Sequence, residues 1–152
     1  MPRRYGRAVA TEGFGARVLE RQDPDGRWAG GAYFPAGFDM EAGGEGQPWT
    51  ATTWSLTSLR EWGLDPAVLR ERRTVDLLAE NCRWEYDDLP YWGGEVDCCI
   101  NAWTLANGRW LGADVEDFRS AAPHDGGPPD PCMSDAIGLI RAARQPDGAD
   151  GR

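Results

Sequence analysis

Few residues in this chain have the types and spacing that catalysis needs, and the clearest are two close carboxylate pairs. Asp23 and Asp25 are separated by one residue, and Asp87 is followed directly by Asp88. Paired carboxylates serve in general acid–base catalysis and in binding divalent cations. Both pairs lie in turn-rich sequence, as in the Asp-Pro-Asp-Gly run that starts at Asp23, so we expect these side chains to be solvated. The sequence therefore identifies no catalytic residue.

Aromatic side chains are a second source of chemistry, because their faces bind apolar ligands and stabilise carbocations. They recur on two segments that hold no charged residue, 47–59 and 98–108. The candidate substrate-binding residues on these segments are Trp49, Thr53, Trp54, Asn101 and Trp103. Such side chains face either a central cavity or the neighbouring helices, and ordinary packing between helices is the alternative interpretation for each Trp.

Three segments of mixed charge alternate with the uncharged ones. They cover residues 7–21, 66–82 and 132–144, and their apolar residues have the spacing of an amphipathic helix. The positions that end them, Gln22, Cys82 and Gln145, recur about every 60 residues. The order is therefore charged helix, aromatic Gly-rich loop and uncharged helix, which is typical of stacked supersecondary units.

The charge pattern predicts two layers of helices. A helix without charge around its circumference must be buried on all sides, whereas an amphipathic helix faces water on one side. We therefore expect an all-α fold, an incomplete α/α toroid (barrel) of outer–inner helix pairs, in preference to an open helical solenoid. Helix pair one spans about 7–62, pair two about 66–111, a loop covers 112–130, and the third pair begins in 131–152.

Local signals place the ends of several helices. Gly63 has the position of a residue that ends the first uncharged helix, and Asp65 with Pro66 has the pattern of an N-cap and first helical residue. The same Asp-Pro pair recurs at Asp130 and Pro131, just before the third charged segment.

The first loop resembles a known repeat. Gln22, Gly26 and Trp28, within GARVLERQDPDGRW, resemble the Gln-Trp motif of the terpenoid cyclase and protein prenyltransferase superfamily, often called the prenyltransferase and squalene-oxidase repeat. The following stretch FPAGFDMEAGGEGQPWTATTWSLTSLREWGLDP is similar to bacterial squalene-cyclase-like proteins, and Gln145 repeats the motif's first residue. The resemblance covers about 8–112 and 132–152. It implies a structural role for the motif and an apolar isoprenoid bound in the barrel cavity.

The resemblance implies three chemistries. The Asp-x-Asp-Asp acid of squalene cyclases and the Asp-Asp-x-x-Asp magnesium motif of isoprenoid synthases are absent from this sequence. Protein prenyltransferase β subunits bind zinc through an Asp-x-Cys pair and a later His, and Asp97 and Cys99 match the first two ligands. The only His is His124, in the stretch that resembles the family least. In the structural alternative, Asp97 caps a helix and Cys99 packs as a small apolar residue.

Charge and hydropathy exclude several partners. The net charge is −9 and every basic residue is Arg, which argues against nucleic acid and against an anionic membrane surface. No run of about 18 apolar residues occurs, and no apolar signal core follows the N-terminal Met-Pro-Arg-Arg. We therefore expect a cytoplasmic protein with reduced cysteines.

The length of 152 residues suffices for one domain, yet it divides into about two and a half helix pairs. A closed toroid of this superfamily implies about five or six pairs, so the chain is expected to be a fragment or a truncated member. Two alternatives remain open. One is a non-catalytic helical module that self-associates or binds a partner through the open barrel edge, and the other is a carbohydrate-active α/α toroid.

Overall fold

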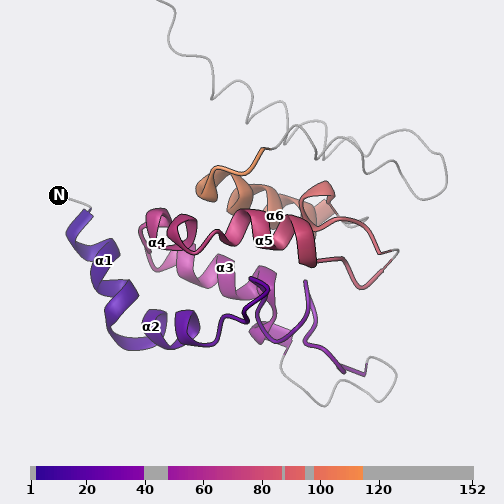
Figure 1. Cartoon of the computed structure of the whole chain (residues 1–152), viewed down its shortest axis with the longest axis horizontal. Coiled ribbons are helices and arrows are strands. Elements are labelled where there is room, and N and C mark those ends of the chain that lie inside the picture. The colour runs from indigo at the N-terminus through magenta and orange to yellow at the C-terminus, as the bar shows by residue number, and fades with distance from the viewer. Residues whose placement is uncertain (1–2, 40–47, 87, 95–97, 115–152) are drawn as a thin grey trace, which may run out of the picture.

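The computed structural model describes residues 3–39, 48–86, 88–94 and 98–114 (Figure 1). Within these ranges the chain forms six α-helices and two short 3-10 helices and contains no β-strand. The predicted all-α class is therefore confirmed for the described part of the chain. No helix in that part is both long enough and apolar enough to cross a membrane.

The first charged segment forms two helices rather than one. Helix α1 spans Arg3–Thr11 and α2 spans Gly13–Glu20, and the chain turns at Gly13, whose φ is +66°. The two helices pack against each other at Gly15, where the Val9 carbonyl leaves no space for a side chain. Because of this bend, α1 lies near Asp65, which directly precedes the helix that begins at Pro66. The Gly6 carbonyl accepts from the Asp65 amide at 3.2 Å.

The second charged segment is also divided. Helix α4 spans Pro66–Glu71 and α5 spans Thr74–Asn81, and Arg73 between them has a φ of +56°. Arg72 at the same break donates from Nη1 to the Leu19 carbonyl at 2.9 Å. The two expected continuous helices, 7–21 and 66–82, are thus each a pair of short helices with a bend.

The two uncharged segments form helices that lie side by side. Helix α3 spans Thr52–Glu61 and α6 spans Cys98–Leu111, and α3 also contacts α2 (Figure 1). The expected helix over 47–59 begins later than predicted, because η1, Pro48–Thr50, is a 3-10 turn in front of it. Helix α2 of the first charged segment contacts α3, and α4 of the second charged segment contacts α6.

A buried polar network joins α3 to α6. The amide of Asn107, which is fully buried, donates from Nδ2 to Thr57 Oγ1 at 3.0 Å and accepts at Oδ1 from Arg60 Nη1 at 3.0 Å. A buried amide that is bonded on both sides avoids the cost of an unsatisfied polar group and fixes the register of the two helices.

Both uncharged helices end in the same motif. After α3, the Leu64 amide donates to the Leu59 carbonyl at 3.0 Å and Gly63 has a φ of +78°. After α6, the Ala113 amide donates to the Gly108 carbonyl at 2.8 Å and Gly112 has a φ of +81°. These are Schellman caps, in which a left-handed Gly satisfies the last helical carbonyls.

The predicted cap at the start of α4 is also present. The carboxylate of Asp65 accepts from the Ala67 amide at 3.0 Å, and Pro66 occupies the first helical position.

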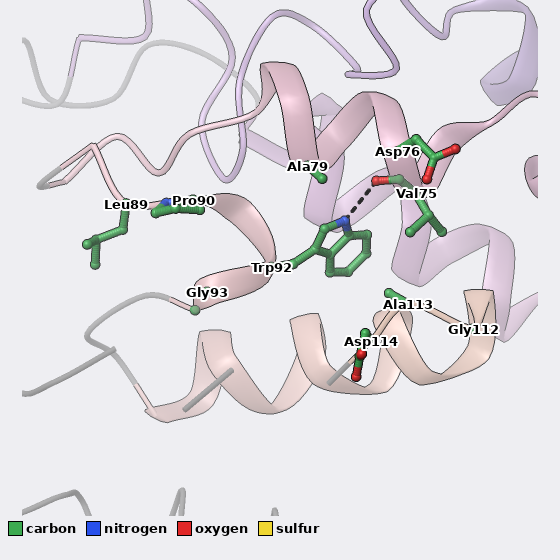
Figure 2. Close-up of a pocket in the computed structure, with 11 residues that line it drawn as sticks. Val75, Asp76, Ala79, Leu89, Pro90, Trp92, Gly93, Gly112, Ala113 and Asp114 are labelled. Atoms are coloured by element: carbon green, nitrogen blue, oxygen red, sulfur yellow. Dashed lines mark hydrogen bonds between the residues drawn. The ribbon is translucent and has the colours of Figure 1, made fainter. Parts of the chain in front are cut away.

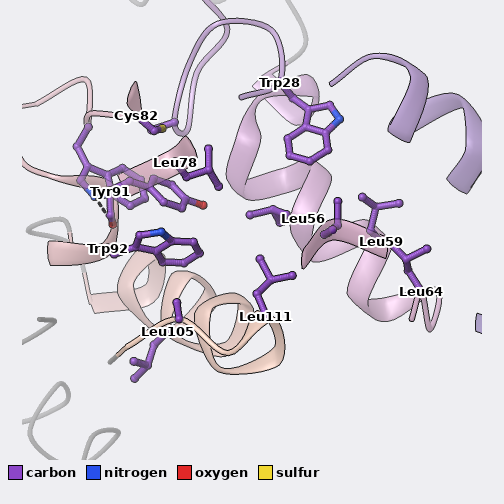
Figure 3. Close-up of a cluster of buried hydrophobic side chains, with 14 of the residues drawn as sticks. Trp28, Leu56, Leu59, Leu64, Leu78, Cys82, Tyr91, Trp92, Leu105 and Leu111 are labelled. Carbon is purple, nitrogen blue, oxygen red and sulfur yellow. Dashed lines mark hydrogen bonds between the residues drawn. The ribbon is translucent and has the colours of Figure 1, made fainter. Parts of the chain in front are cut away.

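The hydrophobic core lies between the helices and contains large side chains from both repeats (Figure 3). Its largest buried members are Trp28, Trp84, Tyr91, Leu56, Leu59, Leu64, Leu69, Leu78, Leu105 and Leu111.

Candidate functional site

The Gln22 side chain joins the loop of the first repeat to the helix α5 of the second. Its Nε2 donates to Thr74 Oγ1 at 3.0 Å and to the Gly26 carbonyl at 3.2 Å. Its Oε1 accepts from Arg72 Nη1 at 3.3 Å. The amide therefore uses both ends to hold the loop against α4 and α5.

Gly26 and Trp28 complete this contact. Gly26 has a φ of +88°, and a Cβ built on it would lie 2.6 Å from the Leu77 Cβ. Trp28 is 2% exposed, and its indole N–H donates to the Val18 carbonyl at 2.7 Å. The motif residues of the first repeat are thus occupied by internal contacts, whereas Gln145 lies outside the described residues.

The loop that follows Trp28 is held by a carboxylate that the sequence analysis did not identify. Glu85 accepts hydrogen bonds from three consecutive backbone amides, those of Ala32 at 2.7 Å, Tyr33 at 3.0 Å and Phe34 at 3.1 Å. Gly31 precedes them, and the Phe34 carbonyl leaves no space for a side chain there. Three amides converging on one carboxylate form an anion-binding nest, which here is filled by the chain itself.

Six aromatic rings gather in this loop and on η1, α3 and α6. We call this group the aromatic platform, and its members are Tyr33, Phe34, Phe38, Trp49, Trp54 and Trp103.

Trp54 lies at the centre of the platform. Its ring centroid is 5.0 Å from Tyr33, 5.3 Å from Trp49 and 5.5 Å from Trp103. Phe34 extends the group, with its centroid 5.2 Å from Tyr33 and 5.1 Å from Phe38. These spacings are those of direct aromatic contact, so the six rings form one connected surface.

The platform is open to solvent. Trp49 is 58% exposed and Trp103 is 42% exposed, whereas Trp54 between them is half-buried. The Trp54 indole N–H donates to the Tyr33 carbonyl at 3.2 Å, so the central polar atom is used internally. Single exposed aromatic residues are common on proteins, but a connected group of them marks an interaction surface.

The other two predicted binding residues lie in the interior instead. Thr53 is 1% exposed, and its Oγ1 lies 3.0 Å from the Tyr91 hydroxyl oxygen. Burial raises the pKa of Tyr91 far above its usual value, so this phenol stays protonated. Asn101 is 2% exposed. Of the five candidate residues, the structure therefore brings together the three Trp.

The predicted carboxylate pairs are occupied or separate. Asp25 pairs with Arg27 at 2.7 Å, and Asp23 accepts from the Gly30 amide at 3.0 Å, so both hold the loop together. Asp88 is exposed, and Asp87 lies outside the described residues. Asp23 and Asp25 are thus partly exposed, and both also have specific partners in the fold.

The predicted metal ligands are placed only in part. Cys99 is exposed in the first turn of α6, whereas Asp97 and His124 lie outside the described residues. Among the residues that the structure describes, no three His, Cys, Asp or Glu side chains are grouped to hold a metal ion. Cys82, by contrast, is buried in the core.

A pocket of about 580 Å³ lies between α5, the turn η2 (Tyr91–Gly93) and the end of α6 (Figure 2). The indole of Trp92 forms part of its wall and donates to the Val75 carbonyl at 3.0 Å. We call it the Trp92 pocket, and it is lined by Val75, Asp76, Ala79, Leu89, Pro90, Trp92, Gly93, Gly94, Gly112, Ala113 and Asp114.

A second hollow, of about 340 Å³, adjoins the aromatic platform. Phe34 and Phe38 belong to both, and Glu85 closes one side of the hollow. A ligand on the platform would therefore have a recess beside it.

No family model, curated protein or solved structure matches this chain.

Proposed function

We propose that this chain is a squalene-cyclase-like or prenyltransferase-like repeat protein of the α/α-toroid type, and that it binds an apolar isoprenoid against the aromatic platform. The observation that carries the proposal is the contact of Trp54 with Trp49 and Trp103, which joins exposed rings from η1, α3 and α6 into one surface. In a toroid, the exposed side of the uncharged helices lines the cavity.

The size of the platform supports binding of a flexible hydrocarbon. Covering about 200 Å² of apolar surface contributes about 5 kcal/mol before the entropic cost of association. Trp49 and Trp103 are 58% and 42% exposed and offer such surface, and the neighbouring hollow beside Phe34 and Phe38 extends it. A chain of isoprene units bends to follow rings that meet edge to face.

The chemistry of the platform favours an apolar ligand over a sugar. Carbohydrate sites combine aromatic faces with polar groups that bond the sugar hydroxyls. The Trp54 indole N–H is already bonded to the Tyr33 carbonyl, and the nearby Glu85 carboxylate is bonded to three backbone amides. These two polar groups beside the rings are therefore committed to the fold.

Calorimetric titration of the full chain with farnesol, a short isoprenoid alcohol, tests the proposal. We expect saturable binding that weakens at least about fivefold in Trp49→Ala and in Trp103→Ala, because each loses a ring that contacts Trp54. Trp62→Ala is the matched control: Trp62 is 46% exposed and contacts Phe14 outside the platform, so its loss should leave affinity unchanged.

Three results would contradict the proposal. One is the absence of farnesol binding to well-folded protein, and another is equal weakening in all three variants. The third is binding of cellohexaose that depends on Trp49 and Trp103 while farnesol does not bind, which would favour the carbohydrate alternative.

A further inference from the structure

We propose that the Trp92 pocket is the docking site of segment 131–144 of this same chain, held as α5 is held against the first repeat. The proposal concerns packing between repeats and goes beyond ligand binding at the platform. It rests on a comparison of two faces of α5, one that contacts the first repeat and one that lines the Trp92 pocket.

One side of α5 contacts the loop of the first repeat. Thr74 accepts from Gln22, Leu77 lies against Gly26, and Asn81 donates from Nδ2 to the Asp25 carbonyl at 3.4 Å. These residues are spaced by three and four positions, so they lie on one face of the helix. The loop of the first repeat is thus closed by the outer helix of the second.

The other side of α5 contacts η2, where the Trp92 indole N–H donates to the Val75 carbonyl, and the Trp92 pocket lies beside this contact. Val75 and Ala79, four positions apart, share a second face and line the Trp92 pocket (Figure 2). Ala79 is exposed and Val75 half-buried. The second repeat therefore offers an apolar hollow on the side where a third repeat would follow.

Trp92 and Trp28 both bond the preceding charged helix, Trp28 in the last turn of α2 and Trp92 in the first turn of α5. Each indole N–H donates to a carbonyl of the preceding outer helix, from Trp28 to Val18 at 2.7 Å and from Trp92 to Val75 at 3.0 Å. The loop of Trp28 is covered by α5 through Gly26 and Leu77. No such cover is present beside Trp92 among the lining residues of the Trp92 pocket.

The chain itself leads to the pocket. The last described residue, Asp114, lines it, and α6 has just ended in the Schellman cap that also ends α3 before α4 begins. Residues 115–130 separate Asp114 from the segment. A linker of that length reaches about 3.3 Å per residue when extended, which is ample to return to the same surface.

The segment has the chemistry to fill the hollow. Its sequence predicts a helix that begins after Asp130, in the pattern of Asp65 and Pro66 before α4. Its apolar residues follow helical spacing and match the apolar wall of the pocket: Met133, Ala136, Ile137 and Ile140. Arg141 and Arg144 are opposite in charge to Asp76 and Asp114, which line the pocket, and Asp76 also pairs with Arg73 at 3.5 Å.

Limited digestion of the full chain with trypsin tests this docking, because Arg141 and Arg144 are cleavage sites. We expect the bonds after both residues to be cleaved at least about tenfold faster in Ala79→Glu than in wild type, since cleavage follows the population of the open segment. Ile137→Asp, which changes the segment and leaves the pocket intact, should accelerate cleavage equally. Ala102→Glu, an equivalent change at an exposed position of α6 outside the pocket, should match wild type.

Near-ultraviolet circular dichroism checks that the Trp-rich core is intact in each variant, and Ile137→Asp remains informative where Ala79→Glu fails to fold. Equal cleavage rates in wild type, Ala79→Glu and Ile137→Asp would overturn the proposal. Protection that appears only as the protein concentration rises would also overturn it, because the occupant would then be a second copy of the chain.

Discussion

Gly26 lies against Leu77 so closely that a Cβ on the glycine would come within 2.6 Å of the leucine Cβ. The contact joins a loop of the first repeat to α5 of the second, and it is reinforced by the hydrogen bond from Gln22 to Thr74. This contact explains why the Gln-x-x-x-Gly-x-Trp spacing serves the fold here, and it leads to a direct test.

Gly26→Ala should lower the free energy of unfolding by about 2–4 kcal/mol, because it adds both left-handed strain and a clash with α5. Gly37→Ala is the control, since Gly37 has a similar φ of +77° but nothing within 4 Å of its Cβ position. It should cost only the strain, about 1–2 kcal/mol. Urea unfolding measures both, and equal losses would show that the contact with Leu77 is unimportant.

Glu85→Ala should release the loop that carries Tyr33 and Phe34. Three backbone amides lose their shared acceptor, and we expect a loss of about 1–2 kcal/mol because water partly replaces it at this exposed site. Hydrogen exchange at the amides of Ala32, Tyr33 and Phe34 should accelerate. Glu80→Ala on the exposed side of α5 should change stability by less than about 0.5 kcal/mol. Unchanged exchange in Glu85→Ala would rule out the carboxylate as the holder of the loop.

Asp25 should make stability depend on pH. The hydrogen bond from Arg27 lowers the pKa of the Asp25 carboxyl below its usual 3.8. A carboxyl whose pKa is lower in the folded state contributes stability above its unfolded pKa and loses it as the pH falls through the folded value. The stability advantage of wild type over Asp25→Asn should therefore be full at pH 6 and shrink below about pH 4. Urea unfolding across this range checks it, and a constant difference would contradict the ion pair's contribution.

Cys82 and Cys99 should differ in reactivity. Burial raises the pKa of the Cys82 thiol to about 12, whereas Cys99 is exposed. Because the thiolate is the reactive form, iodoacetamide at pH 8 should alkylate Cys99 at least about a hundredfold faster in native protein. Peptide mass mapping measures both sites. Unfolding in guanidinium chloride should remove the difference between the two alkylation rates. A difference that persists in the unfolded chain would come from the sequence around each cysteine and not from burial.

The features that were predicted correctly from the sequence are local ones. Asp65 caps α4, and Gly63 ends α3 in a left-handed conformation. Each depends on residues within about four positions, so the pattern alone specifies it. The absence of charge over 47–59 and 98–108 predicted that these segments contact neighbouring helices, and α3 and α6 do lie side by side, although Trp103 on α6 is 42% exposed.

Local signals of this kind did not predict the breaks in the two charged helical segments. Arg73 adopts a left-handed φ in the middle of a segment with continuous helical periodicity. Non-glycine residues adopt this conformation at a cost, and nearby contacts such as Arg72 with the Leu19 carbonyl hold the bend. Those contacts join residues more than fifty positions apart, which a local pattern does not report.

The sequence also predicted the candidate site only in part. The uncharged segments drew attention to Trp49, Trp54 and Trp103, which do form the centre of the platform. They also suggested Thr53, which lies in the interior against Tyr91. Helical spacing places a residue on a face, but the identity of the helix opposite that face decides whether the residue is buried.

By itself, the sequence determined the all-α class, the alternation of charged and uncharged helices, and the caps that end them, because these follow from propensity and charge within a few residues. Only the tertiary structure decided that Glu85 holds the amides of the first loop, that Asn107 joins α3 to α6, and that Tyr33, Phe34 and Phe38 extend the Trp cluster. Each of these contacts joins separate segments, and their partners are specified only when the chain has packed.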